Sequence, residues 1–268
     1  MHFCTSYIYL QNAFIYWSLT HPLRHISGKD LDRRLENHES TVSIGGRTIT
    51  NLRFADDIDG LVGEEEELAN LVERLDKAST AYGMEISAKK TKLITNNTTG
   101  INTEIKVNGQ RLETATSFKY LGSVTTDEGS KPEILSRIAQ TTAVLTRLKP
   151  VWIDKSISLS SKIRLMRSLV TFIFLYACES WTLTAELQRR IQAMEMRCYR
   201  NLLHFSYKDH VTNEEVRAKI QPAIGPHEDL LTTVKRHKLQ WYGHISRSSG
   251  LAKSILQGTE KGIRWQDG

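Results

Sequence analysis

The stretch Asn51–Val62, NLRFADDIDGLV, decides our expectation for the fold. Apolar residues lead up to the acidic pair Asp56 and Asp57 and resume directly after it. The segment therefore predicts two short strands joined by a tight turn that carries both carboxylates. Because neighbouring carboxylates repel each other, a hard divalent cation such as Mg²⁺ neutralises them most easily. The hairpin is a candidate metal site, although an ordinary Asp-Asp turn has the same pattern.

Two further blocks follow this hairpin in the chain. The string FADD, which ends at Asp57, resembles motif C of reverse transcriptases, particularly those of LINE-type (non-LTR) retrotransposons. AYGMEISAKKTKLI at Ala81–Ile94 resembles motif D of that family, and FKYLGS at Phe118–Ser123 resembles its motif E, the primer grip. Three ordered blocks are more specific than one. The resemblance extends from Val42 to Gly258 and indicates the C-terminal palm and thumb portion of such an enzyme.

The resemblance implies RNA-directed DNA polymerisation, in which a primer 3′-hydroxyl attacks an incoming deoxynucleotide with Mg²⁺, or Mn²⁺, bridging the reacting groups. The partners implied are template RNA, primer DNA and deoxynucleotides. Asp56 is then the expected metal ligand and Asp57 a weaker second one, while Lys90 protonates the departing pyrophosphate. The residues expected to hold the primer are Phe118, Lys119, Tyr120, Leu121 and Gly122.

The blocks that resemble motifs D and E also have a purely structural interpretation. Lys90 equally fits the solvated basic edge of a strand. FKYLG equally fits an aromatic strand within a core. Their position after motif C gives the functional interpretation most of its weight.

The segment ahead of the hairpin does not fit the family. A reverse transcriptase carries motif A there, with an Asp that shares the metal ions, and a motif B resembling RQGCPLSP. Residues 1–39 show neither, and Asp30 and Asp32 have polar neighbours unlike those of a metal-ligating Asp on a buried strand. Because an incomplete carboxylate cage costs orders of magnitude in rate, we expect this chain to be inactive alone.

Composition sets broad limits on the partners. The chain has 36 Lys and Arg against 30 Asp and Glu, a net charge of +6, which favours an anionic partner. The three cysteines, Cys4, Cys178 and Cys198, are widely spaced and indicate a reducing compartment rather than a disulfide framework. Without a secretion signal or a long apolar span in the sequence, we expect an intracellular protein, nuclear or cytoplasmic, that is not secreted and has no membrane partner.

The hydrophobic periodicity predicts an α+β fold. Residues 1–39 are an atypical segment without recognisable fingers, in which YIYLQNAFIYWSL fits a buried amphipathic helix. By the resemblance, residues 40–128 are expected to form a partial palm of antiparallel hairpins with one packed helix. Two of the hairpins should turn at Gly45-Gly46 and at Asn108-Gly109. The inward stripe of the helix is predicted to consist of Leu68, Leu71, Val72, Leu75 and Ala78. By the same resemblance, residues 129–205 are expected to form a helical thumb-like region, and residues 206–268 a basic helical region that we expect to be truncated. A capping box at Ser130 and Glu133 opens the first thumb helix, and a second box at Thr212 and Glu215 opens a C-terminal helix.

The apolar periodicity also predicts which thumb residues face the core. The apolar run Leu169–Leu175 at the end of the second thumb helix is expected to be buried. The third helix should turn a stripe inward, formed by Leu187, Ile191, Met194, Cys198 and Leu202.

Basic residues on the predicted thumb and C-terminal helices are candidate contacts to a phosphate backbone, and one aromatic is a candidate for base stacking. A solvated helix face explains the same pattern about as well. The candidates are Arg164, Arg167, Arg189, Arg190, Lys235, Arg236, Lys238 and Trp241.

Three hypotheses remain from the sequence. The chain is a remnant of a retrotransposon reverse transcriptase, or a non-catalytic nucleic-acid-binding remnant that uses its basic thumb helices, or a subunit completed by another chain.

Overall fold

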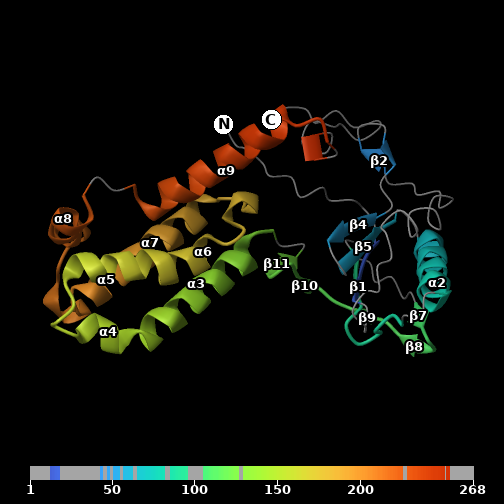
Figure 1. Cartoon of the computed structure of the whole chain (residues 1–268), viewed down its shortest axis with the longest axis horizontal. Helices are drawn as coiled ribbons and strands as arrows, with labels where there is room; N and C mark the ends of the chain where they lie inside the picture. The colour runs from blue at the N-terminus through green and yellow to red at the C-terminus, as the bar shows by residue number, and fades with distance from the viewer. Residues whose placement is uncertain are drawn as a thin grey trace. The chain divides into compact units, whose positions relative to one another are not determined.

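The computed structural model describes residues 13–18, 43–44, 47–48, 51–54, 57–62, 65–81, 85–95, 105–126, 129–225, 228–250 and 252–253. The chain divides into two compact units. We call residues 6–118 with 245–268 the sheet unit, and residues 119–244 with 1–5 the helical unit. Figure 1 labels most of the helices and strands of both units.

A sheet with the strand order β4-β5-β1-β6-β9 forms the centre of the sheet unit, within its described residues. Its strands are β4 (Asn51–Phe54), β5 (Asp57–Leu61), β1 (Ala13–Ser18), β6 (Lys92–Thr95) and β9 (Glu113–Thr114). β4 and β5 pair antiparallel, which confirms the hairpin predicted around the acidic pair. β1 is antiparallel to both of its neighbours, and β9 adds a parallel strand next to β6.

The central strand is the part of the sheet that the sequence did not predict. The expected helix around AFIYWS is wrong, because residues 13–18 form β1. A short continuous run of apolar residues fits a strand with neighbours on both sides as well as it fits a buried helix. Periodicity alone therefore did not separate the two.

Helix α2 (Glu65–Ala81) covers one face of this sheet. Its predicted apolar stripe is confirmed, since the residues of the stripe are all buried. They are Leu68, Leu71, Val72, Leu75 and Ala78. Leu93 of β6 belongs to the same apolar cluster, so α2 lies on the sheet face that carries Leu93.

Two small hairpins complete the described part of the sheet unit. They are formed by β2 (Ser43–Ile44) with β3 (Arg47–Thr48), and by β7 (Lys106–Val107) with β8 (Gln110–Arg111). Both were predicted from their Gly-Gly and Asn-Gly turns. Asn108 and Gly109 both have positive φ, at 49° and 73°, as a two-residue turn of this kind requires.

Hairpin β10–β11 leads into the helical unit, which is otherwise built from helices (Figure 1). The strands are β10 (Ser117–Tyr120) and β11 (Ser123–Thr126). The helices are α3 (Lys131–Arg147), α4 (Lys149–Ile153), α5 (Leu159–Leu165), the π-helix η1 (Met166–Thr171), α6 (Phe172–Leu175), the 3-10 turn η2 (Cys178–Ser180), α7 (Ala185–Leu202), the 3-10 turn η3 (Tyr207–Asp209), α8 (Asn213–Ile224) and α9 (Leu230–Arg247).

The core of the helical unit follows the predicted helical stripes on α7. Its five predicted inward residues are buried: Leu187, Ile191, Met194, Cys198 and Leu202. The apolar run at the end of the second thumb helix behaves differently, because only part of it turns inward. Val170 and Phe174 are buried, whereas Leu169 and Phe172 are exposed. The π-helix η1 lies within this run and changes the number of residues per turn, which rotates the following residues relative to an α-helical stripe.

The start of α3 also differs from the prediction. Ser130 caps nothing with its side chain; its hydroxyl oxygen instead accepts from the N–H of Thr182 at 2.7 Å. Glu133 accepts from the N–H of Val124 at 2.6 Å and pairs with Arg137. The predicted capping box is therefore wrong, because tertiary partners use both side chains.

The described residues thus combine helices with short strands, which is consistent with the α+β class. A search of the described helices for one long and apolar enough to span a membrane finds none.

Candidate functional site

Of the two aspartates of FADD, the structure describes only Asp57. Asp57 is the first residue of β5, where it pairs with Phe54 of β4. It is therefore part of the strand and not of the turn that we predicted. The two-residue connection consists of Ala55 and Asp56, which lie outside the described residues.

Strand β1 lies directly beside the acidic hairpin. Its last residue, Ser18, pairs with Asp57, and Tyr16 pairs with Asp59. The sequence of β1, AFIYWS, contains no carboxylate. The strand next to the hairpin therefore supplies no third acidic ligand within residues 13–18.

Asp59 is the second acidic residue of β5. It lies two residues after Asp57, so both residues are on the same face of the sheet, opposite the face covered by α2. Its side chain is only 1% exposed. Tyr16 pairs with Asp59 on one side and with Lys92 on the other, and the Lys92 ammonium forms an ion pair with Glu113.

The predicted magnesium site stays a prediction. Among the described residues, His, Cys, Asp and Glu form no group of three or more that fits a metal ion. Asp56, the expected principal ligand, is not among these residues.

Lys90 lies on an exposed turn and not on a strand, since β6 begins only at Lys92. The turn is held by the carbonyl of Ser87, which accepts from the N–H of Lys90 at 3.0 Å and from the N–H of Thr91 at 2.9 Å. The Thr91 hydroxyl donates to the same carbonyl. This arrangement fixes the backbone and leaves the Lys90 side chain exposed to solvent.

The predicted primer-grip segment forms strand β10 and the turn after it. Phe118 is buried and Lys119 is exposed, as alternation along a strand requires. Leu121 and Gly122 form the turn between β10 and β11, with φ values of 46° and 83°. Two consecutive positive φ values are typical of a type I′ hairpin turn.

Helices of the helical unit hold this turn in place. The Tyr176 hydroxyl donates to the carbonyl of Leu121, and the Arg137 guanidinium donates to the carbonyl of Gly122. The same guanidinium lies 4.6 Å from the centre of the Tyr176 ring. Both carbonyls of the turn are therefore bound by side chains that also contact each other.

Several of the predicted nucleic-acid contacts have partners within the chain. Arg190 pairs with Glu186 at 2.8 Å, and Arg236 pairs with Glu228 at 2.9 Å. The Lys238 ammonium donates to the carbonyls of Glu179 and Trp181, and burial lowers its pKa. The exposed ion pairs of Arg190 and Arg236 add little stability, whereas the half-buried Lys238 is held by two backbone carbonyls.

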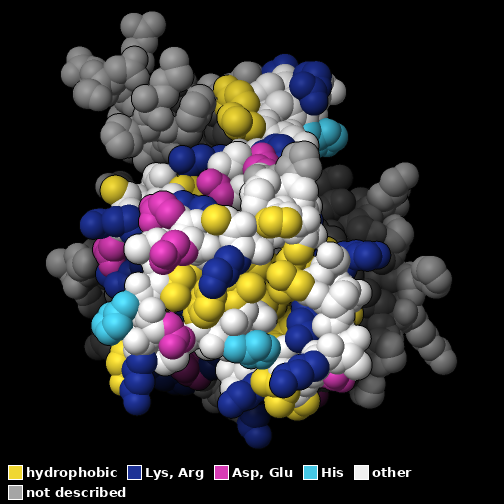
Figure 2. All heavy atoms as spheres, turned by 90° about the vertical axis from the view of Figure 1, so that its left-hand side faces the viewer, with side chains coloured by type: hydrophobic (Ala, Val, Ile, Leu, Met, Phe, Trp, Pro, Cys, Tyr) yellow, Lys and Arg dark blue, Asp and Glu magenta, His cyan; other side chains and the backbone are white. Residues whose placement is uncertain are grey.

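The other predicted contacts are more accessible. Arg164, Arg189 and Lys235 are exposed, and Trp241 is 38% exposed. On the face drawn in Figure 2, basic side chains are spread among hydrophobic and acidic ones instead of forming one patch. On that face, charge alone does not mark a path for a nucleic-acid backbone.

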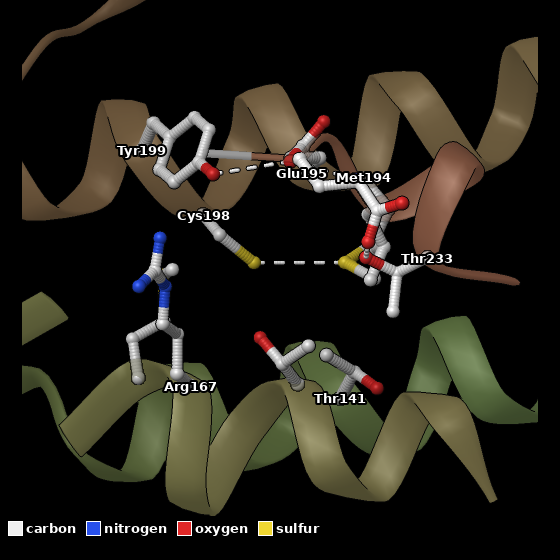
Figure 3. Close-up of a pocket in the computed structure, with 11 residues that line it drawn as sticks. Thr141, Arg167, Met194, Glu195, Cys198, Tyr199 and Thr233 are labelled. Carbon is white, nitrogen blue, oxygen red and sulfur yellow. Dashed lines mark hydrogen bonds between the residues drawn. The ribbon is translucent and has the colours of Figure 1, made fainter. Parts of the chain in front are cut away.

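Arg167, also predicted to contact nucleic acid, lines a small cavity of about 40 Å³ inside the helical unit (Figure 3). The Glu195 carboxylate at this cavity accepts from the Tyr199 hydroxyl and from the N–H of Leu230, both at 3.0 Å. Burial and the charge of Glu195 raise the pKa of Tyr199, so the phenol stays a neutral donor. The buried Thr141 hydroxyl lines the same cavity without a partner among the described residues. The space suits one water molecule.

Comparison with known proteins gives limited information. No family model matches the chain. An uncharacterized transposon-derived protein of Caenorhabditis elegans is 26% identical over 208 residues, which cover 76% of this chain and 74% of that protein. The similarity is consistent with an origin in a transposable element.

Proposed function

We propose that this chain derives from a non-LTR retrotransposon reverse transcriptase and corresponds to the C-terminal palm and thumb of that enzyme. The ordered resemblance to motifs C, D and E supports this proposal, as does the similarity to a transposon-derived protein. The position of the acidic hairpin beside a central antiparallel strand supports the palm assignment.

In this proposal Asp56 and Asp57 bind Mg²⁺ or Mn²⁺, which polarises the reacting phosphate, and Lys90 donates a proton to the leaving pyrophosphate. In this proposal the catalytic site for polymerisation is incomplete in this chain taken alone. The observation that carries this conclusion is the pairing of Asp57 with Ser18, because a strand with a hydroxyl at this position leaves the metal cage one carboxylate short.

Primer extension on poly(rA)/oligo(dT) with Mg²⁺ or Mn²⁺ tests this proposal, comparing the chain with its Asp56→Ala, Asp57→Ala double variant. We expect no incorporation by either protein. Incorporation that the double variant loses would show that a third carboxylate comes from elsewhere in the chain. Incorporation only after adding a fingers-containing partner chain would favour a subunit completed in trans.

Nucleic-acid binding by the helical unit is the second candidate function. Residues 131–176 contain eight Lys and Arg but only two Asp and Glu, a net charge of +6 that equals the net charge of the whole chain. Such a concentration of charge favours an anionic polymer. We expect salt-dependent binding that is unchanged in the Asp56→Ala, Asp57→Ala variant, measured by fluorescence anisotropy. Absence of binding at low salt would contradict this function.

A further inference from the structure

We propose that a groove between α3 and α6 binds a single strand of nucleic acid, with bases stacked on Phe172 and Tyr176 and a phosphate bound by Arg147. This inference rests on the proposed nucleic-acid binding by the helical unit and names the form of nucleic acid and the residues that bind it. Neither the groove nor its aromatic residues were among the contacts predicted from the sequence.

The groove has a volume of about 440 Å³, which is within the range of ligand-binding clefts. It runs along α3 and α6, which pack side by side (Figure 1). Its walls are Arg137, Gln140, Ala143, Val144 and Arg147 from α3, with Phe172, Ile173 and Tyr176 from α6 and its C-cap. Apolar surface dominates this lining, and none of the lining residues is acidic.

Two aromatic side chains stand open on one wall of the groove. Phe172 is 72% exposed and Tyr176 is 45% exposed. They are four residues apart, so they lie on the same side of the helix. Covering these aromatic side chains would remove apolar area from water, which is favourable, and adjacent exposed apolar residues that line a groove are typical of a binding site.

The π-helix η1 explains why these aromatic residues point outward. Met166, Val170, Phe174 and Cys178 occupy the buried side at steps of four residues. The core is therefore filled by this stripe. Phe172 and Tyr176 fall between its members and remain on the surface.

Tyr176 is already fixed in position. Its hydroxyl donates to the carbonyl of Leu121, and the Arg137 guanidinium lies over its ring. Arg137 is in turn held by the buried Glu133 carboxylate at 2.6 Å. When a base stacks on this ring, the Tyr176 side chain therefore loses little conformational entropy. The groove also begins next to the turn predicted to hold the primer.

The net charge of the segment that forms the groove favours an anionic occupant, and Arg147 on the groove wall is exposed. Of the eight basic residues in 131–176, five are exposed: Lys131, Arg147, Lys149, Lys155 and Arg164. Both acidic residues of this segment have local partners, since Glu133 pairs with Arg137 and Asp154 accepts from Ser156. A second copy of the same positively charged surface would be repelled.

Exposed rings distinguish a single strand from a duplex. A ring stacks on a base only when a face of the base is accessible, and this is the case in single strands. A duplex offers phosphates to the basic residues but no base faces to Phe172. The combination of the exposed Arg147 with aromatic walls therefore fits an unpaired strand.

The test is fluorescence anisotropy of the full chain with a labelled oligo(dT) of about 12 nucleotides, a length within the site sizes of single-strand-binding folds. Mg²⁺ and deoxynucleotides are left out, so the result does not depend on the acidic hairpin. The variants are Phe172→Ala, Phe172→Trp and Arg147→Gln. Matched controls on η3, outside the groove, are Tyr207→Ala, which removes an aromatic that is 84% exposed, and Lys208→Gln.

We expect Phe172→Ala to weaken binding about tenfold, since a stacked base contributes on the order of 1–3 kcal/mol. Phe172→Trp should retain binding. Arg147→Gln should reduce the salt slope by about 0.7, as expected for one lost phosphate contact to a single strand. Both η3 controls should bind like the parent chain.

Four outcomes would overturn the inference. If the parent binds oligo(dT) and Phe172→Ala binds equally well, the groove is not the site, while nucleic-acid binding itself stands. If a duplex binds as tightly and shows the same sensitivity to Phe172→Ala, stacking on an unpaired base is wrong. If Phe172→Ala instead converts a dimer into a monomer in light scattering, a second copy occupies the groove. Absence of binding to any nucleic acid would also overturn the proposed function of the helical unit.

Discussion

Ser18, the last residue of β1, pairs with Asp57, the first residue of β5. The acidic hairpin therefore has a hydroxyl-bearing residue as its neighbour in the sheet. This pairing defines a position at which a second carboxylate can be placed directly opposite Asp57.

Ser18→Asp should create a divalent-cation site with Asp57. Without metal, we expect a lower Tm, because like charges directly opposite on paired strands destabilise by about 0.2–1 kcal/mol. Mn²⁺ should raise the Tm of this variant more than that of the parent, since a ligand that binds only the folded state stabilises it. Thermal unfolding with and without Mn²⁺ measures both effects. The Ser18→Asn variant, which has a neutral side chain of the same shape, is the control. If Mn²⁺ raises the Tm of Ser18→Asn as much as that of Ser18→Asp, the proposed cation site is contradicted.

Arg137→Met should destabilise the helical unit by about 3–5 kcal/mol, because it leaves the buried Glu133 carboxylate without its cation. It also removes the donor to the carbonyl of Gly122. Arg190→Met is the matched control, since Arg190 and Glu186 form an exposed pair at the same spacing on α7 and should lose less than about 1 kcal/mol. Urea unfolding compares the two. If both variants lose the same free energy of unfolding, the buried pair contributes no more to stability than the exposed one.

Cys178 and Cys198 should not react in the folded protein. Both are buried, and burial raises the pKa of each thiol to about 12. Only the thiolate is nucleophilic, so little of it exists near neutral pH. In a Cys4→Ser background, Ellman's reagent at pH 8 should find no accessible thiol in the native state and two after denaturation. Reaction of a thiol before unfolding would argue against the packing around α7 or η2.

Glu215 should make the stability of α8 depend on pH. Its carboxylate accepts from the N–H of Thr212 at 2.8 Å and from the Thr212 hydroxyl, and these bonds hold its pKa below the ordinary value of 4.5. A lowered folded-state pKa gives stability that is present above the unfolded pKa and is lost as the pH falls through the folded pKa.

Glu215→Gln should therefore unfold at a lower urea concentration than the parent at pH 6. The difference should disappear below the folded pKa, in the acidic range under 4.5. Glu214→Gln, beside it in the first turn of α8, is the control without this pair of hydrogen bonds. A difference between parent and Glu215→Gln that is constant across pH would show that the hydrogen bonds do not depend on the charge.

The sequence predicted elements well where local signals determine them. The capping box of α8, with Thr212 and Glu215, is confirmed, and so are the buried stripes of α2 and α7. The same pattern at Ser130 and Glu133 failed because Thr182 and Val124 compete for those side chains from distant parts of the chain. A motif of four residues carries no information about such partners.

In the candidate sites, too, the sequence predicted the local features and missed those that depend on distant parts of the chain. The hairpin at Asp57 follows from local alternation, but its neighbour β1 comes from a remote segment without a periodic pattern. The groove at Phe172 depends on the π-helix η1, and a continuous apolar run does not indicate which of its residues turn outward. These features arise from tertiary packing, so a reading of local spacing missed them.

The position of β1 at the centre of the sheet constrains how the chain assembles. β1 precedes both of its partners, β5 and β6, and is separated from each of them by a long stretch of sequence. Pairing over such separations is slow, since the loop must close before the contacts form. Until β1 arrives, β5 and β6 each keep an open edge that can pair with another chain. Newly made protein is therefore most prone to aggregate before β1 has paired with β5 and β6.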